Sequence, residues 1–452
     1  MKKSITLIFT SVVILFCYIF LLNRYPLFWG DSITYLKYAY KNEWHTFGSI
    51  LYPQLLRLVL YFQSPWVVIL LQSLISSYVL LEFTKNYFNK NVGQIYLGLT
   101  LILCFSSYGF FVNTMMPDIF LGLGIVCNYS IISKKIKLKS IPIYLIFAFC
   151  LMAHNGFIYI FILINIILGI LFLVQKNRDS LKSVGLSFTI ILCVLFFVRP
   201  IVGSLYQYDE RDNRNINFFC RQILISSFNG TGSFQDLLSY RCKEGFNSEV
   251  CSYTPSKKEI SNLKFRKKIE VDCKDIFLTA LSNIDFLKKF VGTKISNAYF
   301  MSYNFRLLRN SGSNIKWHDK IQIRIPEEKF LPIEQSIVNT NSLAFKNRIL
   351  ILADINWMLI IISVFLIITF YFLKLFQNSL KTRISVLSLE RGAFMIFYFI
   401  LAISISIVFY TLFSRFSNTR YAIRLSWLII LLASTITIDL ISKKWVNRDK
   451  EI

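Results

Sequence analysis

Long runs of apolar residues without charged side chains recur along this chain, and they constrain its fold more than any other feature. About ten of them approach the roughly 20 residues that an α-helix needs to cross a bilayer. A segment in lipid must satisfy its own backbone hydrogen bonds, so runs of this length form helices. The composition agrees, with 55% hydrophobic and 16% aromatic residues. The sequence therefore predicts an all-α polytopic membrane protein with about ten transmembrane helices.

The expected spans end at charged or polar residues. They are Ser4–Leu22, Trp66–Phe83, Val92–Val112, Ile119–Ser133, one span on each side of His154–Gly156, Val184–Val198, Ile349–Leu373, Ala393–Phe413 and Leu425–Ile441. No small-residue cleavage site follows the first run, and further spans come after it. We therefore expect a retained helix there rather than a cleaved signal peptide.

Lys and Arg are distributed unevenly between the loops. Basic clusters such as Lys134–Lys139 and Lys374–Arg391 follow every second expected span, whereas the loops Thr114–Pro117 and His154–Gly156 contain no Lys or Arg. Short basic loops stay in the cytoplasm, so both termini are predicted to be cytoplasmic. This bias explains about half of the cations behind the net charge of +25. No nucleic-acid-binding motif occurs, and nucleic acid is not an expected partner.

These expectations divide the chain into three parts. An N-terminal transmembrane module, 1–200, contains a first outer loop at 24–63, and a C-terminal module covers 348–452. Between spans seven and eight lies a large periplasmic or extracytoplasmic segment, 201–347, because long loops are translocated regardless of charge. Aromatic residues occur throughout this segment, so we expect an α-rich or mixed folded domain.

Four of the nine cysteines lie in this outer segment, namely Cys220, Cys242, Cys251 and Cys273. An oxidising compartment would allow up to two disulfides among them, and all three pairings stay open. Their spacing matches no zinc motif, and no metal site is predicted.

Two acidic residues lie where expected spans reach the outer face. Asp31 follows the first span, and Asp118 opens the fourth within an otherwise uncharged run from Val92 to Ser133. Either residue could simply favour the start of a helix, where a carboxylate caps backbone N–H groups and complements the dipole. Acids at membrane depth are, however, functional as a rule. Both residues are candidate catalytic groups.

Other polar residues on the outer side could bind a substrate. His154 and Asn155 lie in a short apolar connection, and His45 lies in the first outer loop. Each histidine could equally be an ordinary loop residue.

Three arginines before the last span, Arg415, Arg420 and Arg424, depart from the positive-inside pattern because their loop is short and external. Guanidinium groups bind phosphate in a bidentate manner, so this cluster predicts a phosphate-bearing ligand. Nonspecific binding to lipid headgroups is the alternative.

The order of these motifs resembles that of the C-type (GT-C) glycosyltransferases, polytopic enzymes whose donors are polyprenyl-phosphate sugars. The resemblance rests on Asp31 and Tyr35 in a DxxxYL pattern, the stretch Leu51–Arg57, Asp118, and the Arg420–Tyr421 pair before a late span. It covers the layout up to about residue 175 and only short motifs beyond. The paired acids usual after the first span are reduced to Asp31. The size, span number and outer segment look most similar to bacterial O-antigen-modifying (serotype-converting) glucosyltransferases.

The resemblance implies an inverting hexosyltransferase of the bacterial inner membrane, with its active site facing the periplasm. It would move a hexose such as glucose from undecaprenyl phosphate glucose or a similar donor to O-antigen or another glycan, in lipopolysaccharide biosynthesis. Asp31 would be the base, and Asp118 would orient the acceptor or share that role. Arg420, Arg424 and Arg415 would neutralise the departing phosphate. Substrate contacts would come from Tyr35, His45, Arg57, His154, Asn155 and Tyr421. No cofactor is required, and divalent-cation assistance stays open.

Two other functions are compatible with the sequence. A glycan polymerase or ligase also joins lipid-linked sugars outside the cytoplasm, but it would transfer a whole oligosaccharide. A transporter is disfavoured, because the spans contain hardly any mid-membrane charge and no pair of broken helices.

Overall fold

The computed structural model describes residues 2–24, 26–28, 30–41, 51–88, 90–133, 141–204, 288, 343–380, 386–413 and 420–448, with only the backbone described at several helix ends. Throughout these ranges the chain is helical apart from short connections. Their only β-type pairing is an isolated bridge between Leu27 and Thr114. The predicted helical class is therefore confirmed for this part of the chain.

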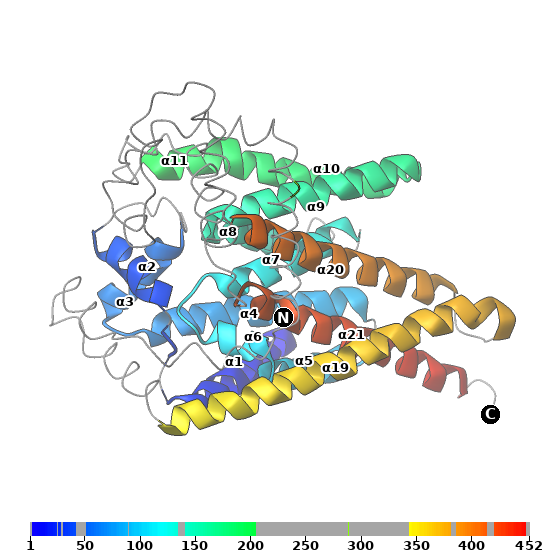
Figure 1. The fold of residues 1–452 in the computed structure, drawn as a ribbon, viewed down its shortest axis with the longest axis horizontal. Coiled ribbons are helices and arrows are strands. Elements are labelled where there is room, and N and C mark those ends of the chain that lie inside the picture. The colour runs from blue at the N-terminus through cyan, green and yellow to red at the C-terminus, as the bar shows by residue number, and fades with distance from the viewer. Residues whose placement is uncertain are drawn as a thin grey trace. The chain divides into compact units, whose positions relative to one another are not determined.

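Figure 1 shows the described helices, and each expected span coincides with at least one of them. They are α1 (Lys2–Leu22), α2 (Gly30–Lys41), α3 (Tyr52–Phe62), α4 (Trp66–Tyr87), α5 (Val92–Cys104), α6 (Ser107–Val112), α7 (Asp118–Ile132), α8 (Ile141–Ala153), α9 (Asn155–Val174), α10 (Arg178–Cys193), a π-helical turn (Val194–Val198), α11 (Arg199–Ser204), α19 (Leu343–Leu380), α20 (Val386–Phe413) and α21 (Arg420–Arg448).

The chain divides into two compact units. The first contains residues 1–208, 305–405 and 422–452, and it holds nearly all of the described helices. The second contains residues 209–304 and 406–421, of which the structure describes Lys288, the end of α20 and the start of α21.

Seven helical stretches in the described ranges are long and apolar enough to cross a membrane: α1, α4, α9, α10 through α11, α19, α20 and α21. This indicates a membrane protein with several candidate spans. Three other expected spans correspond to shorter apolar helices, α5, α7 and α8. At 13–15 residues they are about 20–22 Å long, less than the roughly 30 Å of a hydrocarbon core.

Several expected spans differ from the helices that the structure describes; α19 and α20, for example, begin before Ile349 and Ala393. The third is broken at Phe105–Ser106, where the Ser106 side chain accepts a hydrogen bond from the backbone N–H of Tyr108 and caps α6. The seventh continues past Arg199 through a π-helical turn, which accommodates Pro200 and its missing N–H. The last helix begins at Arg420, so Arg420, Tyr421 and Arg424 are helical rather than loop residues.

All 15 residues of helix α7 are buried. It contacts α4, α8 and α10, and the Tyr398 hydroxyl of α20 donates to the Ile125 carbonyl at 3.2 Å. Two glycines allow close approach: a Cβ atom on Gly122 would lie 2.5 Å from Cζ2 of Trp427, and one on Gly124 would lie 2.8 Å from Cζ of Phe161. A helix that is apolar all round requires such an environment.

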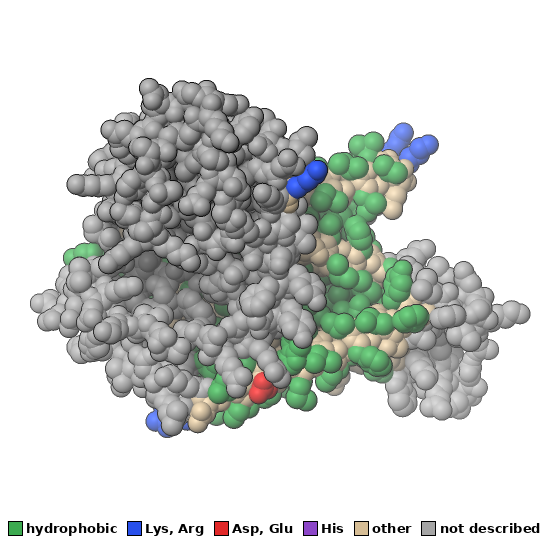
Figure 2. All heavy atoms as spheres, in the orientation of Figure 1, with side chains coloured by type: hydrophobic (Ala, Val, Ile, Leu, Met, Phe, Trp, Pro, Cys, Tyr) green, Lys and Arg blue, Asp and Glu red, His purple; other side chains and the backbone are tan. Residues whose placement is uncertain are grey.

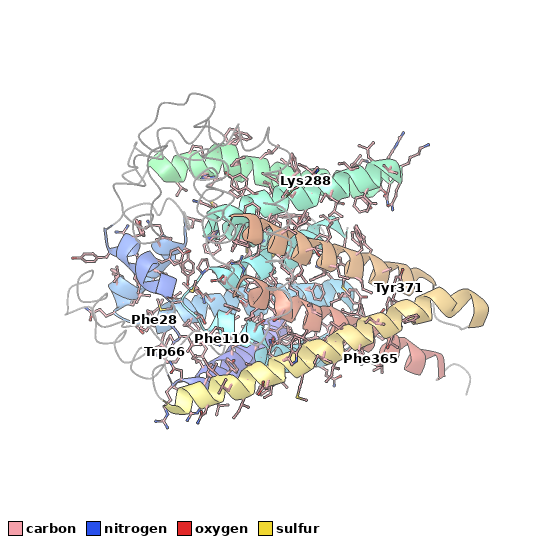
Figure 3. All side chains as sticks on the ribbon, in the orientation of Figure 1. Phe28, Trp66, Phe110, Lys288, Phe365 and Tyr371 are labelled. Atoms are coloured by element: carbon pink, nitrogen blue, oxygen red, sulfur yellow. The ribbon has the colours of Figure 1, made fainter. Side chains whose placement is uncertain are left out.

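Hydrophobic side chains also cover the outward faces of the helices. Figure 2 shows them in green over the visible helix surface, with Lys and Arg in blue at a few separate places, one of them the right-hand end of the uppermost helix. Phe365 and Tyr371 on α19, labelled in Figure 3, are 68% and 55% exposed. Apolar area of this extent is unfavourable in water, and it fits contact with lipid tails.

Substitution of Gly122 by alanine tests the packing of α7 against α21. We expect Gly122→Ala to destabilise the protein by about 1–3 kcal/mol, because the new methyl group would overlap the rigid Trp427 ring. Gly98→Ala on α5 is the control, since no atom lies within 4 Å of its Cβ position. It should leave stability unchanged or raise it by up to about 1 kcal/mol. Thermal unfolding of the two purified variants in detergent measures the difference, and equal unfolding temperatures would refute the packing.

Candidate functional site

Asp118 at the start of α7 and Arg424 near the start of α21 form a buried ion pair. Nη1 of Arg424 donates to Oδ1 of Asp118 at 2.7 Å, and the two side chains are 1% and 2% exposed, respectively. Among the side chains that the structure describes, these are the only charged ones that are buried. Charges removed from water need such a partner, and the positive N-terminal end of α7 also favours the carboxylate. The pair joins segments 306 residues apart.

An aromatic ring connects this ion pair to the turn between α8 and α9. The Arg424 guanidinium lies 5.7 Å from the centroid of the Phe157 ring, which is a cation–π distance. His154 stacks on the same ring at 5.0 Å. Nδ1 of His154 accepts a hydrogen bond from the Gly156 backbone N–H at 3.1 Å and so caps α9. The proton of a neutral His154 is therefore assigned to Nε2.

A buried amide holds the connection between α6 and α7, which leads to Asp118. Nε2 of Gln72 on α4 donates to the carbonyl oxygens of Val112 and Thr114 at 2.8 and 3.0 Å. Oε1 of Gln72 accepts from the Tyr52 hydroxyl at 2.8 Å. Gln72 therefore ties α3 and the segment leading to Asp118 to the same point on α4.

Tyr52 lies at the start of α3, outside the candidate spans. Burial, followed by the neighbouring Tyr35 and Asp118, raises the pKa of Tyr52 well above its ordinary value. The phenol consequently stays protonated at neutral pH and remains a hydrogen-bond donor.

Backbone hydrogen bonds bring the helix of Asp31 to the same end of the first unit. The Leu27 N–H donates to the Asn113 carbonyl at 3.0 Å, and the Met115 N–H donates to the Leu27 carbonyl at 2.9 Å. Figure 3 labels Phe28, which follows this bridge, and Phe110 on α6. Helix α2 begins three residues after Leu27, and α7 begins three residues after Met115. The starts of α2 and α7, which carry Asp31 and Asp118, thus both lie shortly after the paired residues Leu27 and Thr114.

A further backbone contact ties α3 to the turn that carries His154. The Leu51 N–H donates to the Met152 carbonyl at 3.3 Å, directly before Tyr52 and two residues before His154. Two of the outer connections expected from the sequence therefore contact the segment 24–63 through their backbones.

Four of the candidate site residues belong to one cluster: Asp118, Arg424, His154 and Tyr35. The Tyr35 ring packs edge-to-face on Tyr52 with centroids 5.5 Å apart. Asn155 begins α9 and is half-buried. Arg57 is exposed on α3, where its Nη1 donates to Oε1 of Gln54 at 3.4 Å, and none of the contacts described above joins it to the ion pair.

The remaining candidates fall on parts of the chain with no described side chain. Asp31, Arg420 and Tyr421 have a helical backbone at the starts of α2 and α21, but their side chains are not described. The residues that lie outside the described ranges altogether are His45, Arg415, Cys220, Cys242, Cys251 and Cys273. Their roles stay predictions.

Gln72 and Phe157 of this cluster were not singled out from the sequence, and Tyr52 entered only as part of the stretch Leu51–Arg57. Gln72 carried a usable signal, because it is an amide within the apolar run Trp66–Phe83 and polar groups in spans have a purpose as a rule. Phe157 carried none, since phenylalanine is common throughout the chain, with 43 copies.

The cluster combines groups that can hold an anion with a group that can accept a proton. A guanidinium stabilises phosphate or a developing negative charge, and a carboxylate can serve as a general base. No group of three or more His, Cys, Asp or Glu residues within the described ranges could hold a metal ion.

No protein-family model, curated protein or solved structure matches this chain. Its class is therefore defined by the fold and the site themselves. The protein is helical, with seven described stretches able to cross a membrane, and it contains one buried acid–arginine pair among its described side chains.

Replacement of Gln72 tests its part in holding the cluster together. Gln72→Leu should destabilise the protein by about 1–3 kcal/mol, because the Tyr52 hydroxyl and two buried carbonyl groups lose a partner. Gln94→Leu is the matched control, since Gln94 lies on the exposed side of α5 and its loss should change stability by less than about 0.5 kcal/mol. Thermal unfolding in detergent compares them, and a neutral Gln72→Leu would contradict the network.

The ion pair predicts strong non-additivity between its two members. Arg424→Leu alone should destabilise the protein by roughly 3–5 kcal/mol, because it leaves the buried Asp118 carboxylate without its guanidinium. Adding Asp118→Leu should recover most of that loss, since both charges are then removed. Unfolding of the two single variants and the double variant measures the coupling. Additive effects would mean that the two side chains do not interact.

Proposed function

We propose that this protein is an integral-membrane glycosyltransferase that transfers a hexose from a polyprenyl-phosphate donor to a glycan acceptor. The observation that carries this proposal is the buried Asp118–Arg424 pair at the helix end where α2, with Asp31, also begins. Acids and a guanidinium at one end of apolar helices suit a substrate whose lipid tail stays in the bilayer while its phosphate reaches the protein.

The proposed topology has ten spans, with both termini in the cytoplasm and residues 201–347 outside. Helix α9 supports this orientation, because His154 caps one end while Lys176 and Arg178 follow the other. The positive-inside rule assigns the basic end to the cytoplasm, and the candidate site then opens on the opposite face. In a bacterial inner membrane this face is the periplasm.

In the proposed reaction, Asp31 takes the proton of the acceptor hydroxyl while the acceptor oxygen attacks the anomeric carbon of the hexose. The bond from this carbon to the donor phosphate oxygen breaks through an oxocarbenium-like transition state. Polyprenyl phosphate leaves with the electron pair of that bond, and attack from the opposite face inverts the configuration. Asp118 orients the acceptor hydroxyl or shares the role of base.

Charge stabilisation is the second part of the proposed mechanism. Arg420, Arg424 and Arg415 neutralise the negative charge that grows on the departing phosphate. His154, Asn155, Tyr35 and Tyr421 supply hydrogen bonds and ring faces to the sugars. The narrower proposal, from the resemblance described above, is transfer of glucose to O-antigen.

Substitution of Asp31 tests the assignment of the base. Asp31→Asn should lower hexose transfer by at least about 10²-fold, because the amide cannot accept the acceptor proton. Asp179→Asn is the control, since Asp179 is an exposed acid in the first turn of α10 near the proposed cytoplasmic side. Transfer of labelled hexose from a polyprenyl-phosphate donor in vesicles gives the rates, with membrane insertion checked for both variants. Full activity of Asp31→Asn would remove this assignment.

The same vesicles test the proposed function itself. Vesicles with the protein should consume a polyprenyl-phosphate hexose and add single hexoses to a glycan acceptor, whereas vesicles without it should do neither. Addition of whole oligosaccharides, visible as a ladder on a gel, would instead support a polymerase or ligase.

A further inference from the structure

Arg424 has two anionic partners in the proposed mechanism, the donor phosphate and Asp118. Arg424 is assigned to the donor phosphate, yet its Nη1 lies 2.7 Å from Oδ1 of Asp118, and the two side chains are 1% and 2% exposed. Carboxylate and phosphate oxygens use the same guanidinium N–H groups. Asp118 therefore already occupies at least one of the guanidinium N–H groups that a phosphate would need.

We propose that the donor phosphate competes with Asp118 for Arg424. The described ion pair is the donor-free form, and arrival of the phosphate draws the guanidinium away and releases the Asp118 carboxylate toward the acceptor. This inference rests on the proposed function, because it takes the donor to be a polyprenyl-phosphate hexose. In this scheme the Asp118 carboxylate becomes available to the acceptor only after the donor has bound.

Each partner keeps a second source of stabilisation when the pair opens. Asp118 is the first residue of α7, where the helix dipole favours a negative charge. Arg424 lies 5.7 Å from the Phe157 ring centroid and can retain that cation–π contact while its fork turns to another anion. The donor phosphate is a diester with a single negative charge, as on a carboxylate, and its two non-bridging oxygens fit the planar fork in the same bidentate manner.

Residues on both sides hold the surrounding backbone during such an exchange. Gln72 fixes the carbonyls of Val112 and Thr114 just before Asp118, and Ser107 Oγ lies 2.8 Å from Ser426 Oγ just after Arg424. The exchange therefore requires movement of side chains rather than of the two helices.

The alternative is that the ion pair only holds α7 and α21 together. The two possibilities predict opposite effects of Asp118 removal on phosphate binding. If Asp118 competes with phosphate, removing its charge must strengthen phosphate binding, and this gain must depend on Arg424. If the pair is only a clamp, removing Asp118 loosens the site and phosphate binding is unchanged or weaker.

A double-mutant cycle on the full-length protein in detergent tests the proposal. The four proteins are wild type, Asp118→Asn, Arg424→Gln and the double variant, and the probe is a polyprenyl monophosphate, with the corresponding polyprenol as the uncharged control. We expect Asp118→Asn to bind the monophosphate about 5–150-fold more tightly than wild type, with no change for the polyprenol. In the Arg424→Gln background, Asp118→Asn should change the affinity by less than about twofold.

Two results of this cycle would overturn the exchange. Equal or weaker binding by Asp118→Asn would mean that the carboxylate does not compete. A similar gain in the Arg424→Gln background would mean that Asp118 merely repels the phosphate without acting through Arg424.

A second measurement covers the case in which Asp118→Asn does not fold. Carbodiimide modification of Asp118 in the wild-type protein, followed by mass spectrometry, should increase when polyprenyl monophosphate is added and stay constant with polyprenol. Modification that is unchanged or reduced by the monophosphate would overturn the exchange without any variant.

The outcomes also separate this inference from the proposed function. Tight binding of the monophosphate by wild type without coupling in the cycle would refute the exchange and leave the donor assignment standing. Coupling without hexose transfer from any polyprenyl-phosphate sugar would refute the transferase and leave the exchange standing. Failure of wild type to distinguish the monophosphate from polyprenol would refute both.

Discussion

A charge enclosed by apolar helices needs an opposite charge beside it, and here that requirement joins two distant parts of the chain. Asp118 begins α7, whose residues are all buried, and Arg424 reaches it from the start of α21. Since removal of two charges from water is costly, the pair is weak evidence for stability alone. A function explains such a buried pair better than stability does, and Phe157, on which His154 stacks, lies against Arg424.

Polar groups hold together the connections between helices near Asp118, whereas apolar side chains form the spans. Backbone N–H and C=O groups away from water must be paired, and Gln72, the Leu27 bridge and the Leu51 contact pair them across four separate connections. The same hydrogen bonds lie just before the first residues of α2, α3 and α7. These hydrogen bonds thus pair buried backbone groups and also hold the candidate site residues in place.

The proposed glycosyl transfer and the proposed exchange use the same electrostatics. A guanidinium that can hold either a carboxylate or a phosphate allows a buried acid to remain paired until a substrate arrives. Asp118 and Arg424, which have separate roles in the proposed reaction, are therefore linked, because Arg424 binds either Asp118 or the donor phosphate. In this view the ion pair is the resting arrangement of the site.

The apolar runs of the sequence by themselves determined the helical class and the positions of the expected spans, as with Ser4–Leu22 in α1 and Trp66–Phe83 in α4. Run length is a local property, and in lipid it dictates a helix. Asp118, Arg424 and His154 were also recognisable, because polar groups at span ends are few. Only the tertiary structure decided that Arg424 faces Asp118, that Phe157 lies between Arg424 and His154, and that Gln72 holds Tyr52. It also revealed the break at Phe105–Ser106. Most of these contacts join residues far apart in the chain. The packing of whole helices, rather than the local sequence pattern, determines which helix ends come together.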